Sequence, residues 1–392
     1  MRFLLVVPPL TGHITPLRAV AARLRATGHE VAWCGPEPAT TELTGDPAVY
    51  PAGASAPFAV DRRPAGLRGF AALKFLWGRY LIPLADEMVP GIRAAVDEFV
   101  PQVVVADQQA LGGAVVATGL GLPWATSAST STELADALGG LPKIATWIAE
   151  LQHDLCRRHD APTGDLRFSP SLILAFTTRE LAAPPAQRIA SVVRYVGTTA
   201  IEPSTTDFRW TALDGRPLVV VTLGTANAET GHRFLAESVG ALAALREVQG
   251  VVVDPTATLH SDDVLVVTRI PQVELLRRAA VVVCHGGHNT VSESLHAGVP
   301  LVVAPIRDDQ SMLAAQVVAA GAGVRVRFDR ATADDLRLAI TALLTQPHYA
   351  RQAVRLQRSF TAAGGAPEAA RQLESLAHHQ EGQSCNRTST RR

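Results

Sequence analysis

Residues 281–310, VVVCHGGHNTVSESLHAGVPLVVAPIRDDQ, hold the densest group of side chains in this chain that can bind a charged ligand. An apolar strand is expected over 280–284, followed by a His-Gly-Gly-His turn and a helix that begins near Asn289 and Thr290. The unpaired N–H groups of a first helical turn attract an anion. His285 and the polar side chains of Asn289 and Thr290 add hydrogen-bond donors. The segment therefore predicts an anion site at a helix tip.

Two further features indicate which anion this site would bind. Gly286 and Gly287 permit the close backbone approach that a diphosphate requires. Glu293 lies one turn into the expected helix, where its carboxylate can accept hydrogen bonds from a diol such as a ribose. The spacing predicts a diphosphate at the helix tip with a sugar beside it. An ordinary α/β crossover would explain the glycines but not His285 and Glu293 together.

A second candidate site lies in the N-terminal half. His13 is expected on the loop after a strand over 3–7, and Asp107 at the end of another strand of the same sheet. A neutral imidazole is suited to removing a proton from an alcohol or phenol near pH 7. A carboxylate that accepts the other ring N–H would fix the tautomer. From these residues alone, a loop or helix-capping histidine and a helix-capping aspartate remain the alternatives.

The elements that must position these residues alternate between apolar runs and amphipathic stretches. A helix is expected from about 16 to 27, with Thr15 as its N-cap and Pro16 in its first turn. The run over 70–89 is expected to be an amphipathic helix interrupted at Pro83. This alternation predicts an α/β fold with parallel sheets.

Length and composition limit the classes of protein to consider. A chain of 392 residues with 47% hydrophobic residues suits two domains with buried sheets. The formal net charge of zero gives no electrostatic footprint for nucleic acid, and no segment is long and apolar enough to predict a membrane span. The four cysteines are scattered without zinc spacing, so a reducing cytoplasm is the simplest compartment.

The stretch over 197–217 is dense in Thr, Pro and Ser and is expected to link two domains. The predicted division is an N-terminal domain over 1–205, a C-terminal domain over 216–360, a helix over 361–378 and a disordered tail over 379–392.

A wider set of residues carries a family resemblance. It resembles the donor-binding signature of nucleotide-sugar-dependent glycosyltransferases of the GT-B fold, in particular the bacterial natural-product and macrolide-type relatives of UDP-glycosyltransferases. The residues are His285, Gly287, Asn289, Thr290, Glu293, Gly298, Pro300, Asp309 and Gln310. The resemblance implies two Rossmann-like domains that face a cleft, with a C-terminal helix that crosses back onto the N-terminal domain. The Gly-Gly-Ala-Pro break at 364–367 fits such a crossing.

The resemblance also implies roles for individual residues. It makes His13 the catalytic base, with Asp107 as its partner, and it assigns Asp309 and Gln310 to the hydroxyls of the donor sugar. Gly12 is counted among the donor-binding residues.

The nucleotide would lie against two further segments. Thr225 would donate to a phosphate, the main chain of Ile270 would pair with a pyrimidine edge, and Gln272 would lie near the nucleoside. Many relatives have an aromatic residue where this chain has Arg269, and this departure leaves the identity of the base open.

The function implied is an inverting glycosyltransferase. It would move a sugar from a UDP- or dTDP-sugar to a hydroxyl of an apolar natural product, with an acceptor pocket over 70–88 and 127–147. We expect no cofactor and no metal, because Asp308 and Asp309 lack further ligands. The alternatives are a nucleotide-sugar epimerase of the same fold and a non-catalytic sugar-nucleotide-binding helper. A nicotinamide dehydrogenase is disfavoured because no GxGxxG turn is followed by an acid about twenty residues on.

Overall fold

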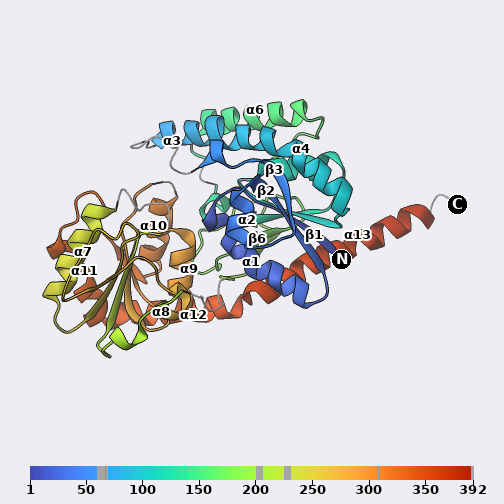
Figure 1. Ribbon diagram of the computed structural model, residues 1–392. Coiled ribbons are helices and arrows are strands. Elements are labelled where there is room, and N and C mark those ends of the chain that lie inside the picture. The colour runs from blue at the N-terminus through green and yellow to red at the C-terminus, as the bar shows by residue number, and fades with distance from the viewer. Residues whose placement is uncertain are drawn as a thin grey trace. The chain divides into compact units, whose positions relative to one another are not determined.

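The computed structural model describes residues 1–59, 67, 69–136, 138–199, 206–224, 231–307 and 309–389, with side chains up to residue 379. The chain divides into two compact units. The first comprises Met1–Phe176, Pro184–Thr199 and Gly364–Arg392, and the second comprises Thr177–Ala183 and Ala200–Ala363. Each unit is a sheet covered by helices (Figure 1), which confirms the predicted α/β class.

The first unit contains a parallel sheet with the strand order β3-β2-β1-β4-β5-β6-β7. Its strands are β1 Arg2–Val6, β2 Glu30–Glu37, β3 Val49–Ala54, β4 Val103–Asp107, β5 Trp124–Ala128, β6 Ile173–Ala175 and β7 Val193–Tyr195. Its α-helices are α1 Thr11–Ala26, α2 Ala39–Thr44, α3 Gly69–Phe75, α4 Ile82–Phe99, α5 Leu111–Gly119, α6 Pro142–Arg158 and α13 Gly365–Ser389.

Both faces of this sheet are buried, which is why its strands are continuous apolar runs. Leu4 and Val6 of β1 point into a core that α4 and α5 cover. Phe3 and Leu5 point the other way, into a core that α1 and α13 cover.

The second unit has a parallel sheet with the strand order β10-β9-β8-β11-β12-β13. Its strands are β8 Leu218–Thr222, β9 Gln249–Val253, β10 Leu265–Val267, β11 Ala279–Cys284, β12 Leu301–Val303 and β13 Gly323–Arg325. Its α-helices are α7 His232–Ala244, α8 Gln272–Leu276, α9 His288–His296, α10 Gln310–Ala319, α11 Ala333–Thr345 and α12 Pro347–Ala362.

Helix α1 begins earlier than the sequence pattern predicts, at Thr11 rather than near Pro16. Its apolar face already starts at the buried Ile14, so burial outweighs the cost of the lost hydrogen bond and the ring clash that a proline inside a helix brings. The hydroxyl of Thr15 does not cap the helix but donates to the carbonyl of Thr11 at 2.8 Å. The prediction of a loop at His13 is therefore wrong, because His13 lies in the first turn of α1.

The helix interruption that the sequence pattern predicts at Pro83 lies elsewhere in the structure. A π-helical segment, Leu76–Leu81, joins α3 to α4, and Pro83 lies in the first turn of α4. A first-turn position tolerates proline because its missing N–H would lack an intrahelical partner in any case. The irregularity thus precedes Pro83, and π-helical turns are frequent at functional sites.

The C-terminal helix packs on the first unit. Ala369, Ala370 and Leu373 are spaced to form one apolar face of α13, and they share a core with α1. His29 Nε2 lies 3.0 Å from Glu374 Oε1 beside this face. The helix is drawn to Ser389, whereas the sequence pattern predicts a disordered tail over 379–392. A polar composition does not by itself prevent a helix from continuing. No described helix is long and apolar enough to span a membrane.

Candidate active site

In the first unit, a histidine, an aspartate and a serine meet at the carboxyl edge of the sheet. His13 Nδ1 lies 2.8 Å from Asp107 Oδ1. Ser129 Oγ lies 2.7 Å from His13 Nδ1 and donates to Asp107 Oδ2 at 2.7 Å. The carboxyl edges of neighbouring parallel strands bring them together, because Asp107 ends β4 and Ser129 follows β5. We call this set the His13–Asp107–Ser129 network.

The network determines which nitrogen of His13 can act as a base. The side chain of Asp107 is fully buried, whereas 13% of the His13 side chain is exposed. A carboxylate only accepts hydrogen bonds, so Nδ1 of His13 must carry the proton that joins it to Asp107. Nε2 then keeps its lone pair, and a neutral imidazole in this tautomer can remove a proton from a hydroxyl.

Aromatic side chains from the predicted acceptor segments lie in the same unit. Phe70 and Trp147, one from each segment, make an edge contact with ring centroids 6.1 Å apart. The Tyr80 ring packs edge-on against Phe58, and its buried hydroxyl has no hydrogen-bond partner among the described residues. Burial, and next the charge of Asp107, raise the pKa of Tyr80, so Tyr80 lies within electrostatic reach of the network.

In the second unit, His285 follows β11 and is buried. Burial, and next the positive charge of Arg307, lower the pKa of His285 to about 4, so its imidazole is neutral at pH 7. Its Nδ1 has no hydrogen-bond partner within the described chain. Glycines are required at 224 and 287, because a Cβ at either position would collide with the imidazole ring. A neutral, buried imidazole is a directed donor for a ligand.

The N-terminus of α9 lies directly after this histidine. Gly286 adopts a left-handed conformation with φ of 85°, and Gly287 occupies the N-cap position without a side chain that could cap the helix. Asn289 and Thr290 lie in the first turn, as predicted from the sequence. The arrangement leaves this helix tip suited to an anion.

Glu293 is almost completely buried on α9, where its Oε2 accepts a 2.6 Å hydrogen bond from Gln272 Nε2 at the start of α8. Burial raises the pKa of Glu293 to about 7, and the bond from Gln272 opposes that shift. The structure thus brings together two residues that the sequence analysis assigned separately to the nucleoside. Ile270 lies two residues before Gln272 and packs at the edge of an apolar cluster.

Asp309 is the N-cap residue of α10, and Gln310 is its first helical residue. Gln310 Oε1 accepts hydrogen bonds from the main-chain N–H groups of Ile306 at 2.9 Å and Arg307 at 3.0 Å. The carbonyl half of this side chain therefore holds the segment after β12. Only its amide half can serve as a donor to a sugar.

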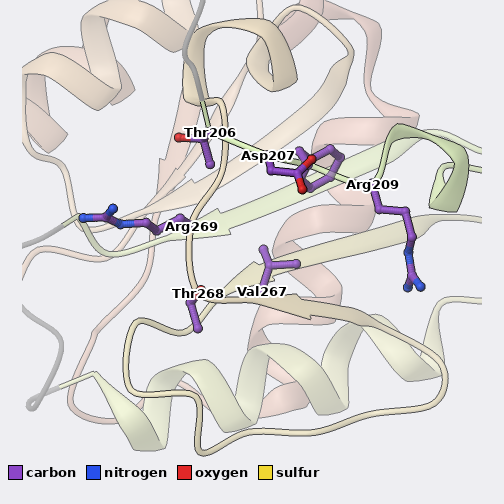
Figure 2. A pocket seen from close by; sticks show the side chains of 7 residues that line it. Thr206, Asp207, Arg209, Val267, Thr268 and Arg269 are labelled. Atoms are coloured by element: carbon purple, nitrogen blue, oxygen red, sulfur yellow. The ribbon is translucent and has the colours of Figure 1, made fainter.

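A pocket of about 570 Å³ lies beside the segment that the resemblance assigns to the nucleobase. It is lined by residues 206–209 and by residues 267–269 (Figure 2). In Figure 2 the Arg269 side chain extends to the left, and the Arg209 side chain extends downwards on the right. The first wall comes from the predicted linker, where Phe208 is buried and Trp210–Ala212 form a short 3-10 helix.

The structure does not place every predicted residue. Thr225 and Asp308 lie outside the described residues. Gly12 lies on α1 in the first unit, whereas the other predicted donor-binding residues belong to the second. Sequence reasoning missed Ser129 and Arg307, because only folding brings them beside His13 and His285. Ser127 is in register with Asp107, and a serine just past the end of that neighbouring apolar strand is the signal that could have revealed Ser129.

The known proteins to which this chain is similar are glycosyltransferases. Residues 211–361 match the family model described as UDP-glucoronosyl and UDP-glucosyl transferase. The 4'-demethylrebeccamycin synthase of Lentzea aerocolonigenes is 28% identical over 96% of this chain and 99% of its own length. The NDP-glycosyltransferase YjiC of Bacillus licheniformis is 25% identical over 94% and 96%.

Solved structures share the whole architecture. The glycotransferase of kitacinnamycin superposes with a TM-score of 0.75 and 25% identity, over 96% of this chain and 98% of that chain. The glycosyltransferase VinC has the same fold, with a TM-score of 0.77 and 19% identity over 97% and 100%. The predicted resemblance is confirmed: the protein is a GT-B glycosyltransferase. Its relatives are UDP-glycosyltransferases and natural-product glycosyltransferases.

Proposed function

We propose that this glycosyltransferase inverts the anomeric configuration and moves a sugar from a UDP- or dTDP-sugar to a hydroxyl of an apolar small molecule. The observation that carries the proposal is the 2.8 Å contact between His13 Nδ1 and Asp107 Oδ1. It leaves Nε2 of His13 as the base, in the logic of a catalytic triad.

The reaction is a single displacement. The acceptor O–H gives its proton to His13 Nε2 as its oxygen forms a bond to the anomeric carbon of the donor. The bond from that carbon to the diphosphate oxygen breaks, and the nucleoside diphosphate leaves with the electron pair. Attack from the face opposite the leaving group turns an α-linked donor into a β-glycoside. General-base catalysis of this kind is worth roughly 10²–10⁴ in rate.

The second unit would bind the donor without a metal. His285, Asn289, Thr290 and the dipole of α9 would stabilise the charge that develops on the diphosphate. Glu293, oriented by Gln272, would accept hydrogen bonds from the ribose hydroxyls. In the same proposal, Thr225 contacts the phosphate and the main chain of Ile270 contacts the base. Asp309 and Gln310 contact the sugar.

The acceptor is proposed to be apolar because aromatic side chains line the segments assigned to it. The Phe70–Trp147 pair offers aromatic rings rather than charges. A cytoplasmic location is part of the same proposal, supported by three described cysteines that are buried and unpaired.

Product analysis tests this function. The full chain would be incubated with UDP-glucose or dTDP-glucose and a panel of apolar alcohols and phenols, and products would be followed by mass spectrometry. We expect a product heavier than its aglycone by one sugar residue, with a β-anomeric coupling in its NMR spectrum. Donor incubated alone is the control. An epimerised donor without an acceptor, or an α-glycoside, would contradict the proposal.

A further inference from the structure

Ser129 lies between the two members of the proposed catalytic pair. Its side chain is 4% exposed and follows directly on β5. Its Oγ donates to Asp107 Oδ2 at 2.7 Å and lies 2.7 Å from His13 Nδ1. A serine hydroxyl has one hydrogen, so when that hydrogen goes to Asp107, its oxygen can only accept from His13. The Nδ1–H of His13 is therefore shared between two oxygens.

The two oxygens of the Asp107 carboxylate are held differently. The main-chain N–H of Gln109 donates to Oδ1 at 2.9 Å. Oδ2 receives the short bond from Ser129, and the hydroxyl of Ser127 lies 3.5 Å away, at the limit of a hydrogen bond. Apart from the bond from His13 itself, Ser129 thus supplies the shortest side-chain hydrogen bond to this carboxylate among the described residues.

We infer that Ser129 is a positioning residue that locks the Nδ1–H tautomer of His13 and the orientation of Asp107. This inference rests on the proposed function, because it assigns to Ser129 an action through the proposed base. In the proposed reaction the hydroxyl acts through His13 and Asp107 and not on the reacting atoms.

Proton NMR tests the inference without a substrate. The shared Nδ1–H of His13 should give a strongly downfield resonance, assigned by its loss in His13→Ala. Ser129→Ala should move this resonance upfield or remove it through faster exchange with water. Ser127→Ala is the matched control, because this buried serine has only the 3.5 Å contact, and it should leave the resonance unchanged. The same spectrum in Ser129→Ala as in Ser127→Ala would overturn the inference.

Kinetics with an acceptor found in the product screen provide the second readout. Ser129→Ala should lower kcat by roughly tenfold and leave the donor KM unchanged, as expected for the loss of one charge-assisted hydrogen bond. Ser129→Thr keeps the hydroxyl and should retain most of the activity. Equal losses in both variants would show that packing matters rather than the hydroxyl. In an Asp107→Asn background, adding Ser129→Ala should lower kcat little further, because the carboxylate that accepts the Ser129 hydrogen bond is already altered.

The outcomes separate this inference from the proposed function. A wild-type chain without any downfield His13 resonance would contradict the His13–Asp107 bond itself, and with it the proposed base. A wild-type resonance that survives Ser129→Ala would contradict the role of Ser129 alone. Thermal unfolding of each variant would show whether the fold is retained, and Ser129→Thr decides the question if Ser129→Ala is unstable.

Discussion

Gln272 Nε2 donates to Glu293 Oε2 across 2.6 Å and so joins the start of α8 to the middle of α9. Burial of this carboxyl raises its pKa to about 7, which is unusual for a glutamate and places its titration near neutral pH. We propose that the helix tip that begins α9 and the carboxyl one turn further contact the same ligand.

The affinity for UDP should depend on pH through Glu293. The ionised carboxylate accepts hydrogen bonds from a ribose diol more strongly than the protonated form, so affinity should fall as pH drops through about 7. Between pH 8 and pH 6 the loss should reach up to about tenfold. Calorimetric titration of the wild type and of Glu293→Gln would measure it. Because the phosphate of UDP also titrates, the same pH slope in both proteins would contradict the prediction.

Replacing His285 should weaken nucleoside diphosphate binding. His285→Ala removes a buried donor at the helix tip, and the expected cost is roughly 2–4 kcal/mol. His296→Ala, at the other end of α9, is the control and should leave binding unchanged. Equilibrium titration with UDP and dTDP would check this prediction. Unchanged affinity in His285→Ala would contradict the assignment of the diphosphate to the N-terminus of α9.

Two variants of Gln310 separate its two halves. Gln310→Glu keeps an oxygen acceptor for the main-chain N–H groups of Ile306 and Arg307 but loses the amide donor. Gln310→Ala loses both. If the amide contacts the donor sugar, Gln310→Glu should reduce turnover while dTDP affinity stays nearly constant. Gln310→Ala should also lower the melting temperature. Equal loss of dTDP affinity and turnover in Gln310→Glu would assign this side chain to the nucleotide.

Packing of the C-terminal helix should contribute measurably to stability. Leu373 is fully buried between α13 and α1, so Leu373→Ala should lower the free energy of unfolding by about 2–4 kcal/mol. Leu338 on α11 is 61% exposed, and Leu338→Ala should change the free energy of unfolding by less than about 0.5 kcal/mol. Urea unfolding followed by circular dichroism would compare them. Equal effects would mean that α13 does not pack on α1 in solution.

The sequence predicted those parts of the site that lie close together along the chain. The strand, glycine turn and helix start to which we assign an anion are encoded locally, because the buried strand, Gly286, Gly287 and the start of α9 lie within a few residues of one another. The α/β class followed for the same reason, since apolar runs such as β4 report burial on both faces.

Contacts between distant segments were harder to predict. Ser129 reaches His13 only because β5 pairs with β4, and no local pattern reports that register. The start of α1 was misplaced because propensity favours Pro16 as a first-turn residue, while burial of Ile14 extends the helix. The link between Gln272 and Glu293 likewise depends on how α8 packs beside α9.

The most direct test is the turnover of His13→Ala with an aliphatic alcohol as acceptor. Because such an alcohol does not ionise unaided, kcat should fall by about 10²–10⁴-fold. Donor affinity should stay constant, because His13 belongs to the first unit, whereas the proposed donor-binding residues other than Gly12 belong to the second. Asp107→Asn should give a smaller loss, and an acidic phenol should partly restore the activity of His13→Ala. Turnover of His13→Ala near the wild-type rate on the aliphatic alcohol would contradict the assignment of His13 as the base.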